Sequence, residues 1–102
     1  MKVQWTERAR EDLRALYSYI AEDNARAARS VVAKLRTATE RAGQSPWAGR
    51  VVPEFEVAEL RERIVAPYRV VYLVRVEAVV IVRIWHARRD LAAEAPPDGE
   101  GP

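Results

Sequence analysis

The chain has 102 residues, of which 49% are hydrophobic, and this is enough for one hydrophobic core but not for two. It has no cysteine, which excludes disulfides and thiolate metal sites, and His86 is the only histidine, so we expect neither a metal nor a cofactor. No stretch approaches the roughly 20 apolar residues of a membrane span, and residues 1–5 do not read as a secretory leader. We therefore expect a cytoplasmic protein that does not associate with membranes.

Charge is unevenly distributed along the chain. The net charge is +2, but residues 92–102 carry three acidic side chains and no basic one, so residues 1–91 hold all 17 basic and 12 of the 15 acidic residues. A basic body suits an anionic partner, although a normally solvated surface explains the same excess.

The first half of the chain predicts a strand followed by a helical hairpin. Residues 2–5 alternate as a short strand does, and Thr6 can cap the helix that follows. Apolar residues then recur at helical spacing in two stretches, the second of which ends at Gly43. Asn24 lies between the stretches and can cap the second helix. So short a connection predicts two antiparallel helices packed by their apolar stripes.

The second half predicts strands. Residues 44–50 form a loop, and strands are expected at about 54–65, 68–76 and 78–85, the last two joined by a tight turn. Side chains alternate along a strand, so the last two strands each have two half-apolar faces. One face should pack on the helices, and the other should be covered by the tail or by a partner. The expected faces are Val70, Tyr72, Val74 and Val76 against Arg69, Val71, Leu73 and Arg75 in the first arm, and Val80, Val82, Ile84 and His86 against Val79, Ile81, Arg83 and Trp85 in the second.

The order of elements is strand, helix, helix and three strands, which predicts an α+β fold of two layers. The last three strands form an antiparallel segment of one sheet. Residues 1–91 are expected to form a single domain, and residues 92–102, rich in proline, glycine and acidic side chains, are expected to be disordered.

Arginines and the histidine gather in the last predicted strands and just after them. Guanidinium groups held on rigid strands can grip an anionic partner or orient a phosphate, and we expect these groups to converge at one end of the sheet. The residues expected to bind a partner are Arg61, Arg69, Arg83, His86, Arg88 and Arg89.

Several short motifs follow one another along residues 3–91. They are Trp5, Ala9-x-x-Asp12-Leu13, Tyr19-Ile20-Ala21, Pro46, Gly49-Arg50, Leu60-Arg61-Glu62, Tyr68-Arg69-Val70-Val71-Tyr72 and His86-x-Arg88-Arg89-Asp90-Leu91. Each motif is weak alone, but their order and spacing together resemble the RelE/ParE superfamily of type II toxin–antitoxin toxins, and the ParE branch most of all.

The resemblance implies a small toxin that a cognate antitoxin neutralises by wrapping it with an extended or helical segment, in a toxin–antitoxin hetero-oligomer. ParE-type members poison DNA gyrase, whereas RelE-type members cleave messenger RNA on the ribosome. We expect gyrase inhibition by protein binding. Ribosome-dependent mRNA cleavage and non-toxic antitoxin binding are the alternatives.

The chemistry of the two toxin types differs. RNA cleavage without a metal needs a base for the 2′-hydroxyl, an acid for the leaving oxygen and cations for the charged transition state. RelE-type nucleases generally place lysines among these cations and a tyrosine near the C-terminus, whereas this chain has no lysine after Lys34 and no tyrosine after Tyr72. A gyrase inhibitor needs a recognition surface, so no catalytic residue is expected. If the chain is a ribonuclease, its catalytic residues are expected to be Arg61, Glu62, Arg83 and His86.

The same residues also have structural explanations. His86 can end the last strand and hydrogen-bond to nearby backbone. Arg88 and Arg89 can form exposed pairs with neighbouring acids, which contribute little stability. The run at residues 61–63 can be a solvated row of charges, and Trp47 can anchor its loop onto the helices.

Overall fold

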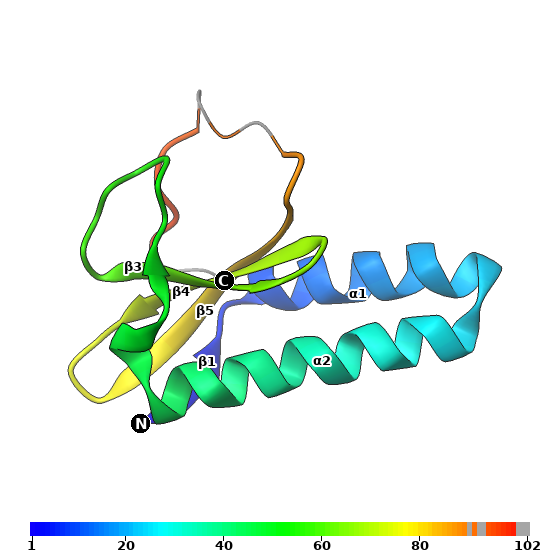
Figure 1. Cartoon of the computed structure of the whole chain (residues 1–102), viewed down its shortest axis with the longest axis horizontal. Helices are drawn as coiled ribbons and strands as arrows, with labels where there is room; N and C mark the ends of the chain where they lie inside the picture. The colour runs from blue at the N-terminus through cyan, green and yellow to red at the C-terminus, as the bar shows by residue number, and fades with distance from the viewer. Residues whose placement is uncertain (90, 92–93, 100–102) are drawn as a thin grey trace.

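The computed structural model describes residues 1–89, 91 and 94–99. In this part of the chain two α-helices pack on one five-stranded sheet, so the predicted α+β fold of two layers is confirmed (Figure 1). The strand order across the sheet is β1-β5-β4-β3-β2, with β1 parallel to β5 and all other neighbours antiparallel. The elements are β1 (Lys2–Trp5), α1 (Glu7–Asp23), α2 (Ala25–Gln44), the 3₁₀ turn η1 (Pro46–Ala48), β2 (Arg50–Val51), β3 (Leu60–Val65), β4 (Tyr68–Val74) and β5 (Ala78–His86).

The two helices begin at the predicted caps. The Thr6 hydroxyl accepts a hydrogen bond from the backbone N–H of Ala9 at 3.1 Å, and the Asn24 side chain accepts one from Ala27 at 3.0 Å. Each bond satisfies a backbone donor that the first helical turn leaves unpaired. The second helix ends at Gln44, one residue later than predicted.

The strand predicted at residues 54–65, observed as β3, begins later than expected, at Leu60. The carbonyl of Val52 accepts hydrogen bonds from the backbone N–H groups of Phe55 and Glu56, so the chain turns here instead of extending. Glu56 also takes a left-handed φ of 53°. β2, whose two residues pair with β3 on the far side of this turn, was not predicted.

The predicted alternation of side chains is correct in β4 but fails halfway along β5. The pairing of β4 with β5 shifts by one residue, so that Val82 has no partner on β4. Such a β-bulge inverts the alternation beyond it. Ile84 therefore packs toward the helices and Trp85 toward the opposite face, each on the face opposite to the one predicted. Val76, predicted as part of the β4 face, lies in the turn after it and is 93% exposed.

The sheet separates two hydrophobic cores. On the helix face, the helices cover one set of buried side chains; on the opposite face, which we call the second face, another set forms a separate cluster. The helix-face strand residues are Val70, Tyr72, Val74, Val79, Ile81 and Ile84, and those of the second face are Leu60, Val71, Leu73, Val80, Val82 and Trp85.

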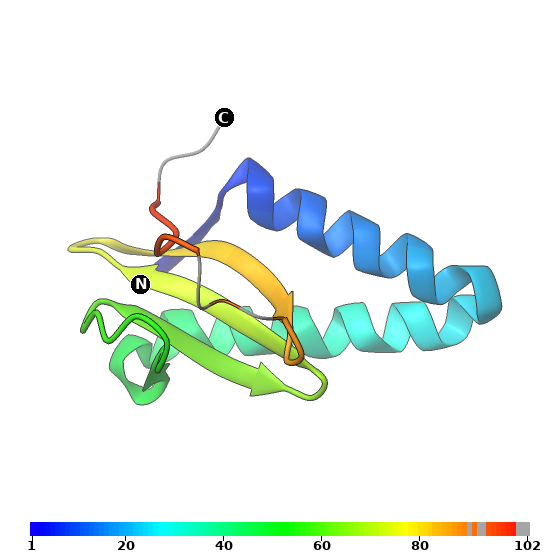
Figure 2. The same cartoon turned by 90° about the horizontal axis from the view of Figure 1, so that it is seen from above.

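The second face is covered by the chain itself. Val52, Phe55 and Val57, from the loop after β2, pack against it, and so does Leu91, which is 2% exposed. Figures 1 and 2 show this loop and the C-terminal segment on the side of the sheet away from α2. The segment Glu94–Gly99 continues over the same face, where a side chain at Gly99 would lie 3.4 Å from Leu73.

The prediction that residues 92–102 are disordered stays a prediction, and residues 92–93 and 100–102 lie outside the described part. Neither α1 nor α2 is long and apolar enough to cross a bilayer, a statement limited to the residues described.

Candidate functional site

Four charged side chains on the β3–β4 side of the second face form a network around the buried Glu62 and Arg69, which we call the inner cluster: Arg50, Glu54, Glu62 and Arg69. The Nε of Arg69 donates to Glu62 at 2.7 Å, and its two terminal nitrogens donate to Glu54 at 2.7 and 2.6 Å. Arg50 donates to the other oxygen of Glu62. The side chains of Arg69 and Glu62 are 6% and 0% exposed. The expectation that Glu62 belongs to a solvated row of charges is therefore wrong.

The inner cluster fixes the loop after β2 on the sheet. The hydrogen bonds from Arg69 lower the pKa of Glu54 to about 2, and Glu54 in turn raises the pKa of Arg69. Both groups are thus charged at any physiological pH. The Arg69 guanidinium is buried and already bound by two carboxylates, which weighs against the predicted contact between Arg69 and a partner. That contact stays a prediction.

A second set of pairs lies at the β5 edge, and we call Asp12, Arg83, Arg89 and Glu94 the outer cluster. Asp12 of α1 accepts hydrogen bonds from the Arg83 side chain at 2.8 and 3.2 Å, and from the backbone N–H of Ile84 at 2.9 Å. β1 pairs with β5 only as far as Ile81, so beyond that point the edge of β5 is open. Asp12 thus satisfies a strand donor that has lost its neighbouring strand.

The other pair of the outer cluster joins two exposed residues. Arg89 donates to both oxygens of Glu94, at 2.7 and 3.1 Å, and their side chains are 41% and 33% exposed. Arg89 lowers the pKa of Glu94, and the more distant charges of Arg83 and Arg8 act in the same direction. Three arginines therefore surround this one carboxylate.

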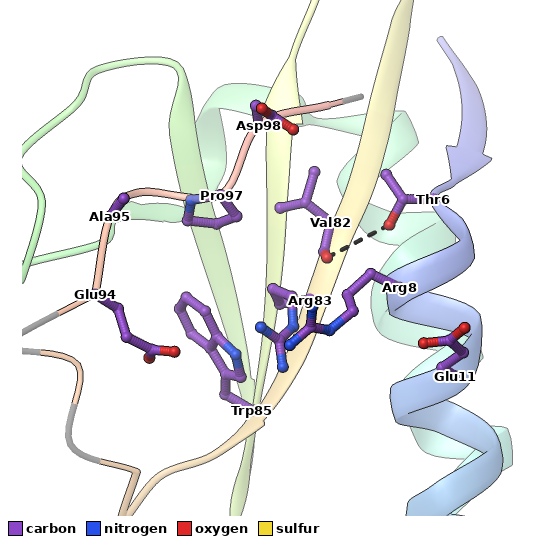
Figure 3. A pocket seen from close by; sticks show the side chains of 10 residues that line it. All are labelled: Thr6, Arg8, Glu11, Val82, Arg83, Trp85, Glu94, Ala95, Pro97 and Asp98. Atoms are coloured by element: carbon purple, nitrogen blue, oxygen red, sulfur yellow. Dashed lines mark hydrogen bonds between the residues drawn. The ribbon is translucent and has the colours of Figure 1, made fainter. Parts of the chain in front are cut away.

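A cavity of about 330 Å³ lies between the start of α1, the bulged part of β5 and the C-terminal segment (Figure 3). Trp85 forms part of its wall and is only 3% exposed, and the guanidinium carbon of Arg83 lies 5.2 Å from the centre of its ring system. The indole Nε1 of Trp85 is buried and has no hydrogen-bond acceptor among the described residues. The other residues that line the cavity are Thr6, Arg8, Glu11, Val82, Glu94, Ala95, Pro97 and Asp98.

Arg61 lies on the other side of the sheet. It pairs with Tyr72 in the register of β3 and β4, and its side chain donates to the carbonyls of Ala58 at 2.7 Å and Gly49 at 3.0 Å. Its guanidinium carbon is 5.0 Å from the ring centre of Trp47. Trp47 is 53% exposed, so the ring meets Arg61 instead of being buried on the helices as predicted.

His86 ends β5, as its structural explanation predicted. Its Nδ1 accepts a hydrogen bond from the backbone N–H of Arg88 at 3.1 Å, and its ring meets that of Tyr68 edge-on at 5.7 Å. Arg88 is exposed. Asp90, the other acid considered as a partner for these arginines, lies outside the described residues.

The four residues proposed for a ribonuclease site lie apart. Arg61 is on the helix face near η1, Glu62 is buried on the second face, and Arg83 is bound to Asp12. His86 pairs with Tyr68, the first residue of β4, whereas Arg61 pairs with Tyr72, near the other end of that strand. The predicted convergence at one end of the sheet is confirmed only in part: Arg69 and His86 lie at the shared end of β4 and β5, whereas Arg61 lies beside Tyr72, farther along β4.

Sequence reasoning missed three residues that define these sites: Asp12, Glu54 and Trp85. Asp12 was noted only as part of a motif, and its pairing with Arg83 was not predicted. A carboxylate beside the apolar stripe of α1 is the signal that could have indicated a cation on the sheet opposite. An arginine among the valines of a central strand likewise predicts a carboxylate partner. Trp85 was assigned to the wrong face because the bulge has no sequence signal of its own. Within the described ranges, no group of three or more histidines and carboxylates could hold a metal ion.

Comparisons with known proteins identify the family of this chain. Residues 3–91 match the model of a family described as the ParE toxin of the type II toxin–antitoxin system parDE. The chain is 39% identical over 89 residues to Toxin RelE2 of Caulobacter vibrioides, a match that covers 86% of this chain and 97% of that protein. It also resembles a solved structure of the chromosomal ParDE system from P. aeruginosa, with a TM-score of 0.70 and 25% identity over 84% of this chain and 95% of the other.

Proposed function

The chain belongs to the ParE toxin family of type II toxin–antitoxin systems, and from this premise we propose that it inhibits DNA gyrase by binding the enzyme and is neutralised by a cognate antitoxin. Because gyrase acts on bacterial DNA in the cytoplasm, the proposal places the protein there. Such an inhibitor traps the cleaved-DNA intermediate of gyrase and needs no acid or base of its own.

The observation that carries this proposal is the separation of the four ribonuclease candidates. General acid–base cleavage needs the acid and the base each within hydrogen-bond reach of the same phosphodiester. Glu62 is 1% exposed and already bound by Arg50 and Arg69, so it could reach a 2′-hydroxyl only if the inner cluster opened. His86 lies two strands away from Glu62 and at the end of β5.

The accessible cations at the end of β5 suit binding of a partner better than catalysis of RNA cleavage. Arg88 is exposed after the end of β5, and Arg89 is partly exposed beside it. On the other side of the molecule the hairpin of α1 and α2 exposes Tyr19, which is 76% accessible. We propose the end of β5 and the outer face of the hairpin as the surfaces that meet gyrase or the antitoxin.

Charge reversal at Arg88 tests the antitoxin contact without disturbing the fold. We expect Arg88→Glu to weaken the complex with the antitoxin, since an exposed cation facing an acidic segment becomes an anion. Lys2→Glu, an exposed cation on β1 outside both proposed surfaces, is the control. Equal dissociation constants for both variants and the wild type would exclude the end of β5 from the antitoxin interface.

The target is tested by inducing the protein in bacteria that carry an SOS reporter, with messages mapped in the same cells. The proposal predicts SOS induction and broken DNA with intact messages, suppression of both effects by the antitoxin, and intact messages in His86→Ala as well. Cut messages without SOS induction, lost in the His86→Ala variant, would replace gyrase by mRNA as the target. No effect of either kind would identify a non-toxic relative.

A further inference from the structure

The cavity beside β5 has the electrostatics of a carboxylate site. Arg8 and Arg83 line it, Arg89 holds Glu94 at its margin, and all three arginines favour the ionised form of that carboxylate. Glu11 and Asp12 are the acids that α1 brings to the same place. Without the C-terminal segment, three arginines would therefore face two carboxylates, one of which is already bound by Arg83.

The wall of the cavity also presents a buried donor that lacks an acceptor. Trp85 is 97% buried, and within the described part of the chain its Nε1–H has no hydrogen-bond partner. Figure 3 shows this nitrogen on the edge of the ring that is turned toward the Arg83 guanidinium. Leaving a buried donor unpaired costs about 1–3 kcal/mol, so an acceptor that enters the cavity gains a hydrogen bond that the described residues do not supply.

The chain's own C-terminal segment already sits over this cavity. Glu94, Ala95, Pro97 and Asp98 line it, and Glu94 is held there by a bidentate pair with Arg89. That pair is more than a third exposed on the arginine side, so it is weak and readily exchanged. The segment is short and carries two carboxylates, Glu94 and Asp98, and the arginines of the cavity favour carboxylates.

We propose that the cavity binds the carboxylates of an acidic, extended peptide segment of the antitoxin, and that Glu94–Gly99 of this chain covers it in cis until that segment displaces it. The inference rests on the antitoxin part of the proposed function and does not involve gyrase. A tethered segment that covers the site weakens every competitor: the apparent dissociation constant is the intrinsic value divided by the fraction of time during which the site is open.

The probe is a synthetic peptide with the sequence of residues 91–102, titrated into full-length protein and followed by NMR at the indole N–H of Trp85. Glu94→Gln removes the carboxylate held in cis, and we expect it to bind the peptide about tenfold more tightly than wild type, as it would if the tail covered the site nine-tenths of the time. Glu77→Gln, in the exposed β4–β5 turn, removes a carboxylate elsewhere and should match wild type. Arg8→Gln, an exposed site, should weaken binding.

The titration overturns the proposal if the peptide binds none of the variants, if Glu94→Gln binds no more tightly than wild type, or if binding leaves the Trp85 indole resonance unmoved. Titrating the same variants with purified antitoxin should give the same order of affinities, and equal affinities would overturn the assignment to the antitoxin. A failed gyrase assay would leave these results untouched, and failure here would leave gyrase inhibition standing.

Discussion

The inner and outer clusters are built from the same chemical pair, an arginine with a carboxylate, on one face of one sheet. Phe55 packs against Trp85 between them, with ring centres 6.3 Å apart. The inner pair of Arg69 and Glu62 is 6% and 0% exposed, whereas the outer pair of Arg89 and Glu94 is 41% and 33% exposed. A buried pair cannot lose one member without leaving a charge in the core, while an exposed pair can exchange its partner. Burial thus assigns the Arg69–Glu62 pair to the fold and the Arg89–Glu94 pair to recognition, and the Arg83–Asp12 pair, 11% and 15% exposed, joins the outer cluster to the fold.

The largest effect should come from the inner cluster. Arg69→Ala leaves Glu62 buried with one partner fewer and releases Glu54, and we expect a loss of about 3–5 kcal/mol in the free energy of unfolding, measured in urea. Arg29→Ala, on the exposed side of α2, is the control and should change stability by less than about 0.5 kcal/mol. A loss below about 1 kcal/mol in Arg69→Ala would mean that the inner cluster is no more structural than the outer one.

Asp12 connects the outer cluster to the fold, so its removal should have an intermediate effect. Asp12→Ala takes the acceptor from both Arg83 and the backbone N–H of Ile84, and we expect a loss of about 1.5–3 kcal/mol in the same measurement. Glu11→Ala, the exposed neighbour on α1, should be close to wild type. Equal stability of the two variants would show that the open edge of β5 needs no cap.

The inner cluster should also make stability depend on acid. The pKa of Glu54 is about 2 in the folded protein against an ordinary value of 4.5, so its contribution is fully present above pH 4.5 and is lost as the pH falls toward 2. The difference in unfolding free energy between wild type and Glu54→Gln should therefore shrink over that interval. Glu54 is 31% exposed, so this effect should be smaller than that of Arg69→Ala. A difference that does not vary with pH would contradict the pairing.

The smallest effect on stability should come from the exposed pair. Arg89→Ala should cost at most about 1 kcal/mol, and added salt should reduce the difference further, because both side chains are solvated. The measurement is urea unfolding at low and high salt. A salt-independent loss as large as that of Arg69→Ala would remove the distinction between the two clusters.

Periodicity and caps sufficed to predict most of the fold, because each depends on residues close together in the chain. The helix starts after Thr6 and Asn24 and the faces of β4 were correct for this reason. The bulge at Val82 could not be predicted, since it arises from pairing between strands. The turn after Val52 is held by local hydrogen bonds, which the strand-like pattern of residues 54–65 did not reveal. The bulge alone moves Trp85 into the wall of the cavity.

The candidate site was harder to predict than the fold. Arginines on strands were correctly singled out as candidates, but which of them are accessible depends on where carboxylates far along the chain lie. Arg69 meets Glu54, and Arg83 meets Asp12, which is 71 residues away in sequence. A strand pattern carries no information about such partners.

The central claim, that this ParE-family toxin acts on gyrase by binding alone, is tested most directly by a supercoiling assay with purified gyrase and detection of cleaved DNA after protein denaturation. The account predicts inhibition with accumulated cleaved DNA, reversal by the antitoxin, and undiminished inhibition by Arg61→Ala. An active gyrase left unaffected by the folded wild-type protein would contradict it.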